Sequence, residues 1–292
     1  MNAPLAMERE GQGWPGREYS RFVEAAGLRW HVQQSPKSRR DRPLLLMLHG
    51  TGASTHTWQG LWPLLAPEVD LLAVDLPGHA FTSTASSQQL SLPGMAQALH
   101  VLLQTMGLQP THAVGHSAGA AILVRMALDG ALQARALFSI NGAFLPFGGP
   151  AAPLLSPLAR LLYASAWVPR LFANRAADPA VVERLVRGTG SHLDPQGLER
   201  YATLIRNPLH AQAALGMMAH WDLPPLARDL PRLQMPLHLL VGQKDAAVSP
   251  GSARRVHALC PRSTLTVLPG LGHLAHEEAP ASVATWMLQL LH

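Results

Sequence analysis

The sequence predicts an α/β protein with a mostly parallel sheet, and three observations lead to that fold class. Eight short segments have strand character, and most lack alternating polar residues, which suits strands buried on both faces. Helical patterns alternate with them, as crossover helices do between parallel strands. The third observation is that one long stretch, 143–228, contains only helical patterns. The expected strands are 19–25, 28–33, 43–48, 69–76, 111–115, 135–140, 236–242 and 263–268, and the expected crossover helices are 93–106, 118–128, 252–259 and 279–291.

The all-helical stretch is expected to form a cap inserted after the sixth strand. Its helical pieces are 157–164, 179–187, 198–205 and 211–220. The cap then covers 143–228, and the core consists of 1–142 and 229–292. The apolar segment 144–172 is broken by prolines and glycines between positions 146 and 153, so it cannot span a bilayer. It either packs on the core or lines an apolar substrate pocket.

The composition excludes several other classes of protein. Of 292 residues, 48% are hydrophobic and 14% are charged, so the chain can bury enough surface to fold. The formal net charge is +5, but the arginines are dispersed and no nucleic-acid-binding motif occurs, so no nucleic acid is expected. The single cysteine, Cys260, excludes an internal disulfide. Without a signal sequence or an apolar run of about 18 residues, we expect a cytoplasmic protein with at most peripheral membrane contact.

The strongest local motif is Gly115-His116-Ser117-Ala118-Gly119, which has the Gly-x-Ser-x-Gly pattern of a nucleophile elbow. An expected strand precedes it and an expected helix follows it directly, which is the context that such an elbow requires. Glycine on both sides of the serine removes side chains that would clash in the tight turn. Ser117 is therefore the predicted nucleophile.

A serine hydroxyl becomes a good nucleophile only when a base accepts its proton. In proteins with this elbow the base is a histidine, and the chain order is Ser, Asp or Glu, then His. Asp245 follows the expected strand 236–242, and His273 follows 263–268. Because the carboxyl ends of parallel strands share one edge of a sheet, Ser117, Asp245 and His273 are predicted to meet there as a catalytic triad.

Other residues of the same types are weaker candidates. His276 could replace His273 as the base, but it falls at the start of the last helix. Asp222 and Asp229 precede strand 236–242 and suit a turn and a helix start. No His-Glu-x-x-His pair or other zinc-ligand spacing occurs, so neither a metal nor a cofactor is expected.

Two backbone N–H groups are expected to bind the oxyanion of the reaction, because such donors can be aimed in advance at the developing charge. One belongs to Ala118, which follows the nucleophile. The other lies in the loop after strand 43–48, where Thr51 stands between two glycines. The buried His49 is expected to stabilise this loop.

These motifs together resemble an α/β-hydrolase with a helical cap, over the chain from about residue 20 to the C-terminus. They are His49-Gly50-Thr51-Gly52, Asp75-Leu76-Pro77-Gly78, the elbow at 115–119, Gly242 with Asp245, and Gly272-His273. Ala80 departs from the glycine often found there, which affects loop shape rather than chemistry. Haloalkane dehalogenases and epoxide hydrolases share the fold but use aspartate where this chain has Ser117, so the resemblance disfavours those reactions.

A narrower resemblance covers cap and core alike. Segments 49–58, 91–99, 115–130, 141–149, 217–223 and 271–278 are similar to the magnesium-chelatase accessory α/β-hydrolases of bacteriochlorophyll biosynthesis. This resemblance implies a role around magnesium insertion into protoporphyrin IX and a transient association with magnesium chelatase.

Three functions remain open at this point. The first is a serine hydrolase that cleaves an ester or related acyl bond and accompanies magnesium-protoporphyrin formation. The second is a non-catalytic tetrapyrrole-binding accessory protein, and the third is a small-ester esterase unrelated to pigments. The expected substrate-pocket residues are His116, Trp167, Met217, Met218 and Trp221. In the accessory protein, Phe172 could also face a flat macrocycle, and Arg160, Arg170 or Arg206 could pair with its propionates.

Overall fold

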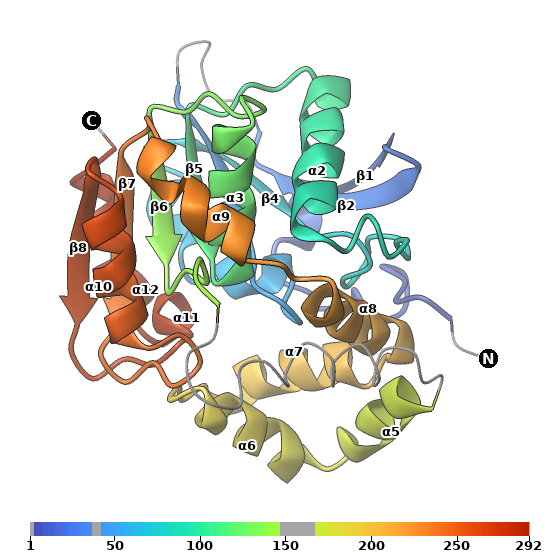
Figure 1. Ribbon diagram of the computed structural model, residues 1–292. Coiled ribbons are helices and arrows are strands. Elements are labelled where there is room, and N and C mark those ends of the chain that lie inside the picture. The colour runs from blue at the N-terminus through green and yellow to red at the C-terminus, as the bar shows by residue number, and fades with distance from the viewer. Residues whose placement is uncertain (1–2, 37–41, 147–166, 292) are drawn as a thin grey trace.

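The computed structural model describes residues 3–36, 42–146 and 167–291, and its centre is an eight-stranded sheet (Figure 1). Each strand falls within an expected segment or differs from it by one residue at an end, so the predicted fold class is confirmed. The strands are β1 (Ser20–Ala25), β2 (Leu28–Gln34), β3 (Leu44–Leu48), β4 (Asp70–Val74), β5 (His112–His116), β6 (Ala136–Ile140), β7 (Leu237–Gly242) and β8 (Ser263–Leu268).

The strand order is β1-β2-β4-β3-β5-β6-β7-β8, and β2 runs antiparallel to both of its neighbours. The other five pairings are parallel. β1 and β2 form a hairpin whose two loop residues, Ala26 and Gly27, have φ of 53° and 72°. Two positive φ values are the signature of a tight hairpin turn that matches the twist of the strands. The parallel strands from β3 to β8 therefore all end at one edge of the sheet.

Helices cover both faces of the sheet (Figure 1). One apolar core joins the sheet to α2 (Leu92–Met106), α3 (Ala118–Leu128) and α10 (Pro250–Leu259), and a second joins it to α1 (Trp62–Leu65) and α12 (Pro280–Leu288). Leu46 and Leu48 of β3 enter the first core, whereas Leu45 and Met47 enter the second. Burial on both sides explains why this strand shows no polar alternation. Four short helices connect these elements: η1 (Arg17–Tyr19), η2 (Thr55–Trp58), η3 (Leu230–Arg232) and α11 (Ala275–Glu278).

The described elements between β6 and η3 are all helical. They are α5 (Val168–Arg175), α6 (Pro179–Gly188), α7 (Pro195–Ile205), α8 (Pro208–Ala219) and α9 (Pro224–Asp229). α5 to α8 lie beyond the edge toward which β6 and β8 point (Figure 1). α6, α7 and α8 contain the expected helices 179–187, 198–205 and nearly all of 211–220, whereas 157–164 lies outside the described residues.

α7 and α8 begin three residues earlier than expected, and their first turns explain why. Asp194 and Asn207 each cap the backbone N–H groups that follow, and a proline stands at the next position. A capping side chain with proline at the first helical position is a strong start for a helix. Apolar periodicity alone misses this signal. No helix in the described part of the chain is long and apolar enough to cross a membrane.

Candidate active site

Ser117 lies in a sharp turn between β5 and α3, as the motif predicts. Its backbone has φ 51° and ψ −115°, a conformation that is strained for any residue with a side chain. The turn fits only because its neighbours are glycines: a Cβ at Gly115 would collide with Ala120, and one at Gly119 would collide with the Leu48 carbonyl. The strand, the turn and the helix together present a partly exposed serine at the helix N-terminus.

Asp245 and His273 lie on the loops after β7 and β8 and are hydrogen-bonded to each other. His273 Nδ1 is 2.8 Å from Asp245 Oδ2, and both residues are buried. The other carboxylate oxygen accepts the N–H groups of Ala247 at 2.8 Å and Val248 at 2.7 Å. Because Nδ1 faces the carboxylate, His273 Nε2 is the ring atom left to exchange a proton with a substrate or nucleophile.

Asn141 also holds this carboxylate, and the sequence analysis gave it no role. Its side-chain amide donates to Asp245 Oδ2 and, at 3.3 Å, to the Gly272 carbonyl. Asn141 directly follows β6 and has φ 51°, a left-handed conformation that asparagine tolerates better than most residues. An asparagine that directly follows a buried strand is the signal that could have identified it.

His116 connects the serine turn to the His273 loop. Its Nε2–H donates to the backbone oxygen of His273 at 2.9 Å, and the two ring centres are 4.7 Å apart. Ser117, the next residue, makes no side-chain hydrogen bond within the described part of the chain. In a protein without substrate, the contact between nucleophile and base is often long and tightens on binding.

The loop 49–52 lies directly on the serine turn. A Cβ added to Gly50 would lie 3.0 Å from Ser117 Cβ and 2.8 Å from His116 Nδ1. Thr51 follows and is half-buried, and Ala118 is the first residue of α3, where N–H groups have no partner within the helix. Both predicted oxyanion donors therefore belong to segments that flank Ser117.

Two histidines hold this loop in place. As expected, His49 stabilises it: its Nδ1–H donates to the Gly50 carbonyl at 2.8 Å, and its Nε2 accepts the Leu76 N–H at 2.9 Å. His210 of α8, which the sequence analysis did not single out, accepts the Ala80 N–H on Nδ1 at 2.9 Å and donates from Nε2 to the Gly52 carbonyl at 3.0 Å. Both rings are neutral in this arrangement.

Burial favours the neutral form of these rings and of their neighbours. It lowers the pKa of His49, lowers that of His210 to about 4, and lowers those of His56 and His276 to about 3. The pKa of His116 also falls well below its usual range, first through burial and then through the neighbouring His276 and His273. Near neutral pH these side chains therefore act as fixed hydrogen-bonding groups rather than as cations.

His276, the alternative base, has a different set of partners. Its Nε2 lies 2.6 Å from Thr57 Oγ1, and the Thr57 hydroxyl donates to Glu277, which also accepts from the Tyr201 hydroxyl at 2.7 Å. Burial raises the pKa of Glu277 to about 7, despite these two hydrogen bonds. This network ties α7 to the core beside His273. The ring that the structure brings to Asp245 is that of His273.

The other two rival residues lie in unrelated surroundings. Asp229 pairs with Arg125 at 2.8 Å and with Arg232 at 3.4 Å, and Asp222 is exposed. Within residues 3–36, 42–146 and 167–291, no group of three or more His, Cys, Asp or Glu side chains is arranged to hold a metal ion.

The expected pocket residues differ widely in their exposure to solvent. Met217 is fully buried beneath the loop 49–52, with its sulfur 3.3 Å from Thr51 Oγ1, and Trp221 is half-buried against the core. Met218 is 46% exposed and Trp167 75% exposed, so these two face solvent instead. The physical reason for Met218 is helix geometry, since consecutive residues point about 100° apart and Met217 already faces the core.

The remaining expected contact residues have partners of their own within the protein. His116 is buried behind the serine turn, with its ring centre 4.5 Å from that of His276. Arg170 lies over the Trp167 ring, and Arg206 pairs with Glu199 at 2.6 Å. Arg160 lies outside the described residues, and the Phe172 side chain is not among those described.

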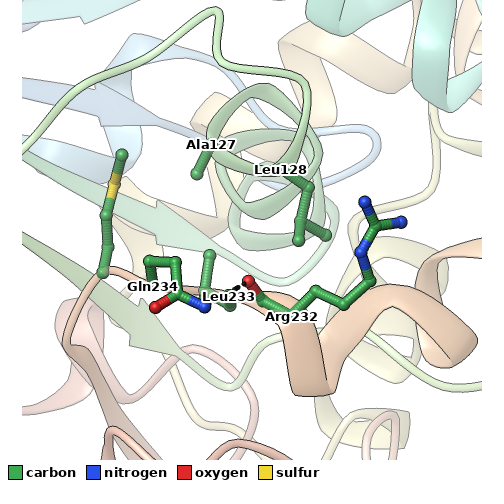
Figure 2. A pocket seen from close by; sticks show the side chains of 6 residues that line it. Ala127, Leu128, Arg232, Leu233 and Gln234 are labelled. Atoms are coloured by element: carbon green, nitrogen blue, oxygen red, sulfur yellow. Dashed lines mark hydrogen bonds between the residues drawn. The ribbon is translucent and has the colours of Figure 1, made fainter.

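Two cavities on the described surface lie away from this site. One, of about 140 Å³, lies between the C-terminal end of α3 and residues 232–235 (Figure 2). Ser117 lies at the opposite end of the same helix, which has 11 residues, so roughly 16 Å separates them. A second, of about 220 Å³, opens beside Tyr19, Trp58 and Trp62. Neither is the candidate active site.

The sheet order, the strained serine turn and the paired histidine and aspartate at the strand ends define the α/β-hydrolase class. The chain belongs to the alpha/beta hydrolase fold family, whose model matches residues 43–280. A magnesium-chelatase 30 kDa subunit of Rhodobacter capsulatus is 33% identical to it over 278 residues, which cover 95% of this chain and 96% of that protein. The resemblance found in the sequence is thus confirmed at the level of the family.

Two further relatives are more distant. A protein of Escherichia coli (strain K12 / DH10B), described as a candidate carbamate hydrolase, RutD, is 23% identical over 277 residues, covering 88% of this chain and 96% of its own. A crystal structure from Acinetobacter baumannii AYE, described as a candidate lipase (lip1), superposes with a TM-score of 0.79 at 19% identity and covers 100% of this chain and 97% of that one.

Proposed function

We propose that this chain is a serine hydrolase that cleaves an ester or related acyl bond, with Ser117 as nucleophile, His273 as general base and Asp245 as its orienting carboxylate. The observation that carries the proposal is the strained serine turn, which His116 links to the backbone oxygen of His273, a histidine whose Nδ1 is 2.8 Å from a buried carboxylate. Backbone strain persists only where the surrounding structure enforces it, and such sites cluster at functional centres.

The proposed reaction has two halves, and each transfers one proton through His273. Ser117 Oγ attacks the acyl carbon while His273 Nε2 accepts the hydroxyl proton, and His273 then gives this proton to the departing alcohol. A water molecule next attacks the acyl-serine, His273 accepts a proton from it, and the acid leaves as the proton returns to Ser117. Asp245 fixes the ring tautomer and stabilises the imidazolium in both halves.

The negative charge that develops on the substrate oxygen needs donors beside Ser117. The N–H groups of Thr51 and Ala118 are our candidates, because their segments flank the serine. His49 and His210 hold the carbonyls of Gly50 and Gly52, on either side of Thr51 in the chain, through hydrogen bonds of 2.8 Å and 3.0 Å. Donors held rigidly in this way stabilise a transition state without having to reorganise.

The relative from Rhodobacter capsulatus supports a biological setting. We propose that the hydrolase acts in the cytoplasm as an accessory to magnesium-protoporphyrin formation in bacteriochlorophyll biosynthesis, on an acyl or tetrapyrrole substrate, in transient association with magnesium chelatase. The support is the 33% identity over nearly the full length of both chains, cap included.

A fluorophosphonate that labels activated serines tests the catalytic part. We expect one covalent adduct on Ser117 in the folded protein and none in Ser117→Ala. Ser20→Ala is the control, since Ser20 Oγ lies 3.0 Å from a histidine ring nitrogen but in a regular strand, and we expect it to keep the adduct. An unlabelled Ser117 in folded protein contradicts the proposal. Acyl esters of graded size, porphyrin esters included, then define the substrate.

The same relative also favours a second candidate function, a tetrapyrrole-binding accessory protein without catalysis. Titration with protoporphyrin decides between them. A shift of the Soret band at micromolar protein, together with magnesium insertion that survives Ser117→Ala in a deletion strain, supports the accessory role. No shift of the band excludes it.

A further inference from the structure

The loop between α6 and α7 reaches from the cap to both triad loops. We name residues Thr189–His192 the cap clamp. The Thr189 carbonyl accepts the Ala246 N–H at 3.1 Å and the His273 N–H at 3.3 Å. A single carbonyl of the cap thus joins the loop that carries Asp245 to the loop that carries His273.

Side chains add two further links. The Ser191 hydroxyl, which is fully buried, accepts the Leu274 N–H at 2.8 Å. The Glu278 carboxylate accepts the His192 N–H at 3.0 Å on one oxygen and the Gly272 N–H at 2.9 Å on the other. The two residues that flank His273 in the chain are therefore both tied to the cap clamp, one directly and one through Glu278.

Glycines allow the three backbones to approach this closely. Gly190 has φ 83°, and a Cβ there would collide with the Lys244 carbonyl. A Cβ at Gly272 would collide with the backbone of Gly190, and one at Gly242 with the carbonyl of Gly272. The loop that carries Asp245, the loop that carries His273 and the cap clamp are thus in direct main-chain contact, without intervening side chains.

We propose that the cap clamp is a positioning device for the His273–Asp245 pair, and that Ser191 is a positioning residue. The inference rests on the proposed hydrolase function. The backbone of His273 determines where its ring can point, and the clamp holds the N–H groups of this residue and of the next one. Asn141 holds Asp245 from the side of the sheet. The His273–Asp245 pair is therefore held by hydrogen bonds from both the core and the cap.

The expected effect is a displacement of the pair and not its loss. The two loops also bond to each other directly, from the Lys244 N–H to the Leu271 carbonyl at 2.8 Å. Removing one link of the clamp leaves that bond intact, so the histidine ring shifts while the fold persists. A small misplacement of a catalytic group can lower a rate by roughly ten- to a hundredfold.

The test compares Ser191→Ala with Ser35→Ala. Ser35 Oγ also accepts a backbone N–H at 2.8 Å, from Leu71, but at the opposite edge of the sheet. The measurements are kcat and KM per phosphonate-titrated site, the Tm, and the downfield proton resonance of His273 Nδ1–H without substrate. Glu278→Gln, which weakens a different link, is the second variant in case Ser191→Ala fails to fold.

For Ser191→Ala we expect kcat to fall roughly tenfold with little change in KM, and the downfield resonance to broaden. Ser35→Ala should lower the Tm and leave both other readouts unchanged. The proposal is overturned if Ser191→Ala or Glu278→Gln lowers only the Tm and leaves kcat and the downfield resonance unchanged. The resonance needs no reaction, so it decides the role of the clamp even if Ser117 proves unreactive and the proposed function fails.

Discussion

The His273–Asp245 pair can be compared with a second pair, His31–Asp75, in which the same two atoms are 2.7 Å apart. The second pair even has a serine in place: Ser20 Oγ lies 3.0 Å from His31 Nε2. By hydrogen bonds alone, Ser20, His31 and Asp75 form the more complete triad. Their surroundings differ from those of the first pair in exposure and in the backbone that carries the serine.

The His31 and Asp75 side chains are fully buried, and Asp75 also accepts the N–H groups of Thr55 at 2.7 Å and Phe81 at 3.3 Å. Burial alone raises a carboxyl pKa, but the neighbouring His31 and His49 rings and the Thr55 N–H together outweigh it and lower the pKa of Asp75 to about 2. Ser20 lies in the regular strand β1, without a strained turn or a helix N-terminus beside it.

This comparison teaches what distinguishes a structural pair from a candidate catalytic one. A structural histidine has both ring nitrogens engaged within the protein, as in His31. His273 has one nitrogen engaged by a carboxylate. Ser117 lies on a strained turn that His116 links to the His273 loop, and its side chain caps no backbone N–H of α3. A candidate catalytic pair is therefore recognised by a histidine ring nitrogen that is not engaged within the protein, and not by the length of the histidine–aspartate hydrogen bond.

Matched substitutions of the two carboxylates should produce opposite outcomes, and this is the largest effect we predict. Asp245→Asn should lower kcat by about ten-thousandfold, because the histidine then adopts the wrong tautomer, with a small change in Tm. Asp75→Asn should cost about 1–3 kcal/mol of stability, because it removes a buried carboxylate that accepts from His31 Nδ1 and from two backbone N–H groups, yet keep turnover per labelled site. Ester kinetics and thermal unfolding measure both. An equal fall of kcat in the two variants would contradict the distinction between a catalytic and a structural pair.

The oxyanion donors sharpen the comparison further, because they flank Ser117 alone. Thr51→Pro removes the N–H, and kcat should fall about a hundred- to a thousandfold. Thr51→Ala keeps the N–H and should retain most of the activity. Initial rates on a small ester, with Tm as the folding control, distinguish the two variants. Similar rates for both would assign the oxyanion to other donors.

The neutral histidines predict a fall of stability in acid. His56, His276 and His210 have folded pKa values of about 3, 3 and 4, against an ordinary value of 6.5. The native state binds fewer protons, so their contribution is complete above pH 6.5 and is lost as the pH falls toward these values. Each can change the free energy of unfolding by up to about 1.4 kcal/mol per pH unit. A free energy of unfolding in urea that stays constant from about pH 7 to 5 would contradict this prediction.

Glu277 should change the stability with pH in the opposite direction from these histidines, and by a smaller amount. Its folded pKa of about 7 exceeds the ordinary value of 4.5, so its contribution is present below pH 4.5 and is lost as the pH rises through 7. Glu277→Gln keeps an acceptor for Thr57 and Tyr201 and removes this titration. Compared with wild type, the variant should therefore lose less stability between about pH 5 and 8. The control is Glu199→Gln on the exposed face of α7, which should show no such change.

Local sequence patterns predicted the eight strands and the three loops that carry Ser117, Asp245 and His273. Those patterns suffice because apolar strands and glycine turns depend on nearby residues. They did not predict the roles of Asn141 and His210, whose partners lie 104 and 158 positions away in the chain. They also did not predict that Met218 and Trp167 are exposed, because an apolar side chain in a helical segment can face a pocket, the core or solvent.

The sequence by itself determined which chemical groups stand at the ends of the parallel strands, since strand burial and turn geometry are encoded over a few residues. Only the tertiary structure decided which histidine meets which carboxylate, and that the cap reaches into the site through Ser191 and Glu278. Such choices depend on long-range main-chain contacts, and residues that make them carry no local pattern. Two histidine–aspartate pairs can therefore have nearly the same hydrogen bond and different surroundings.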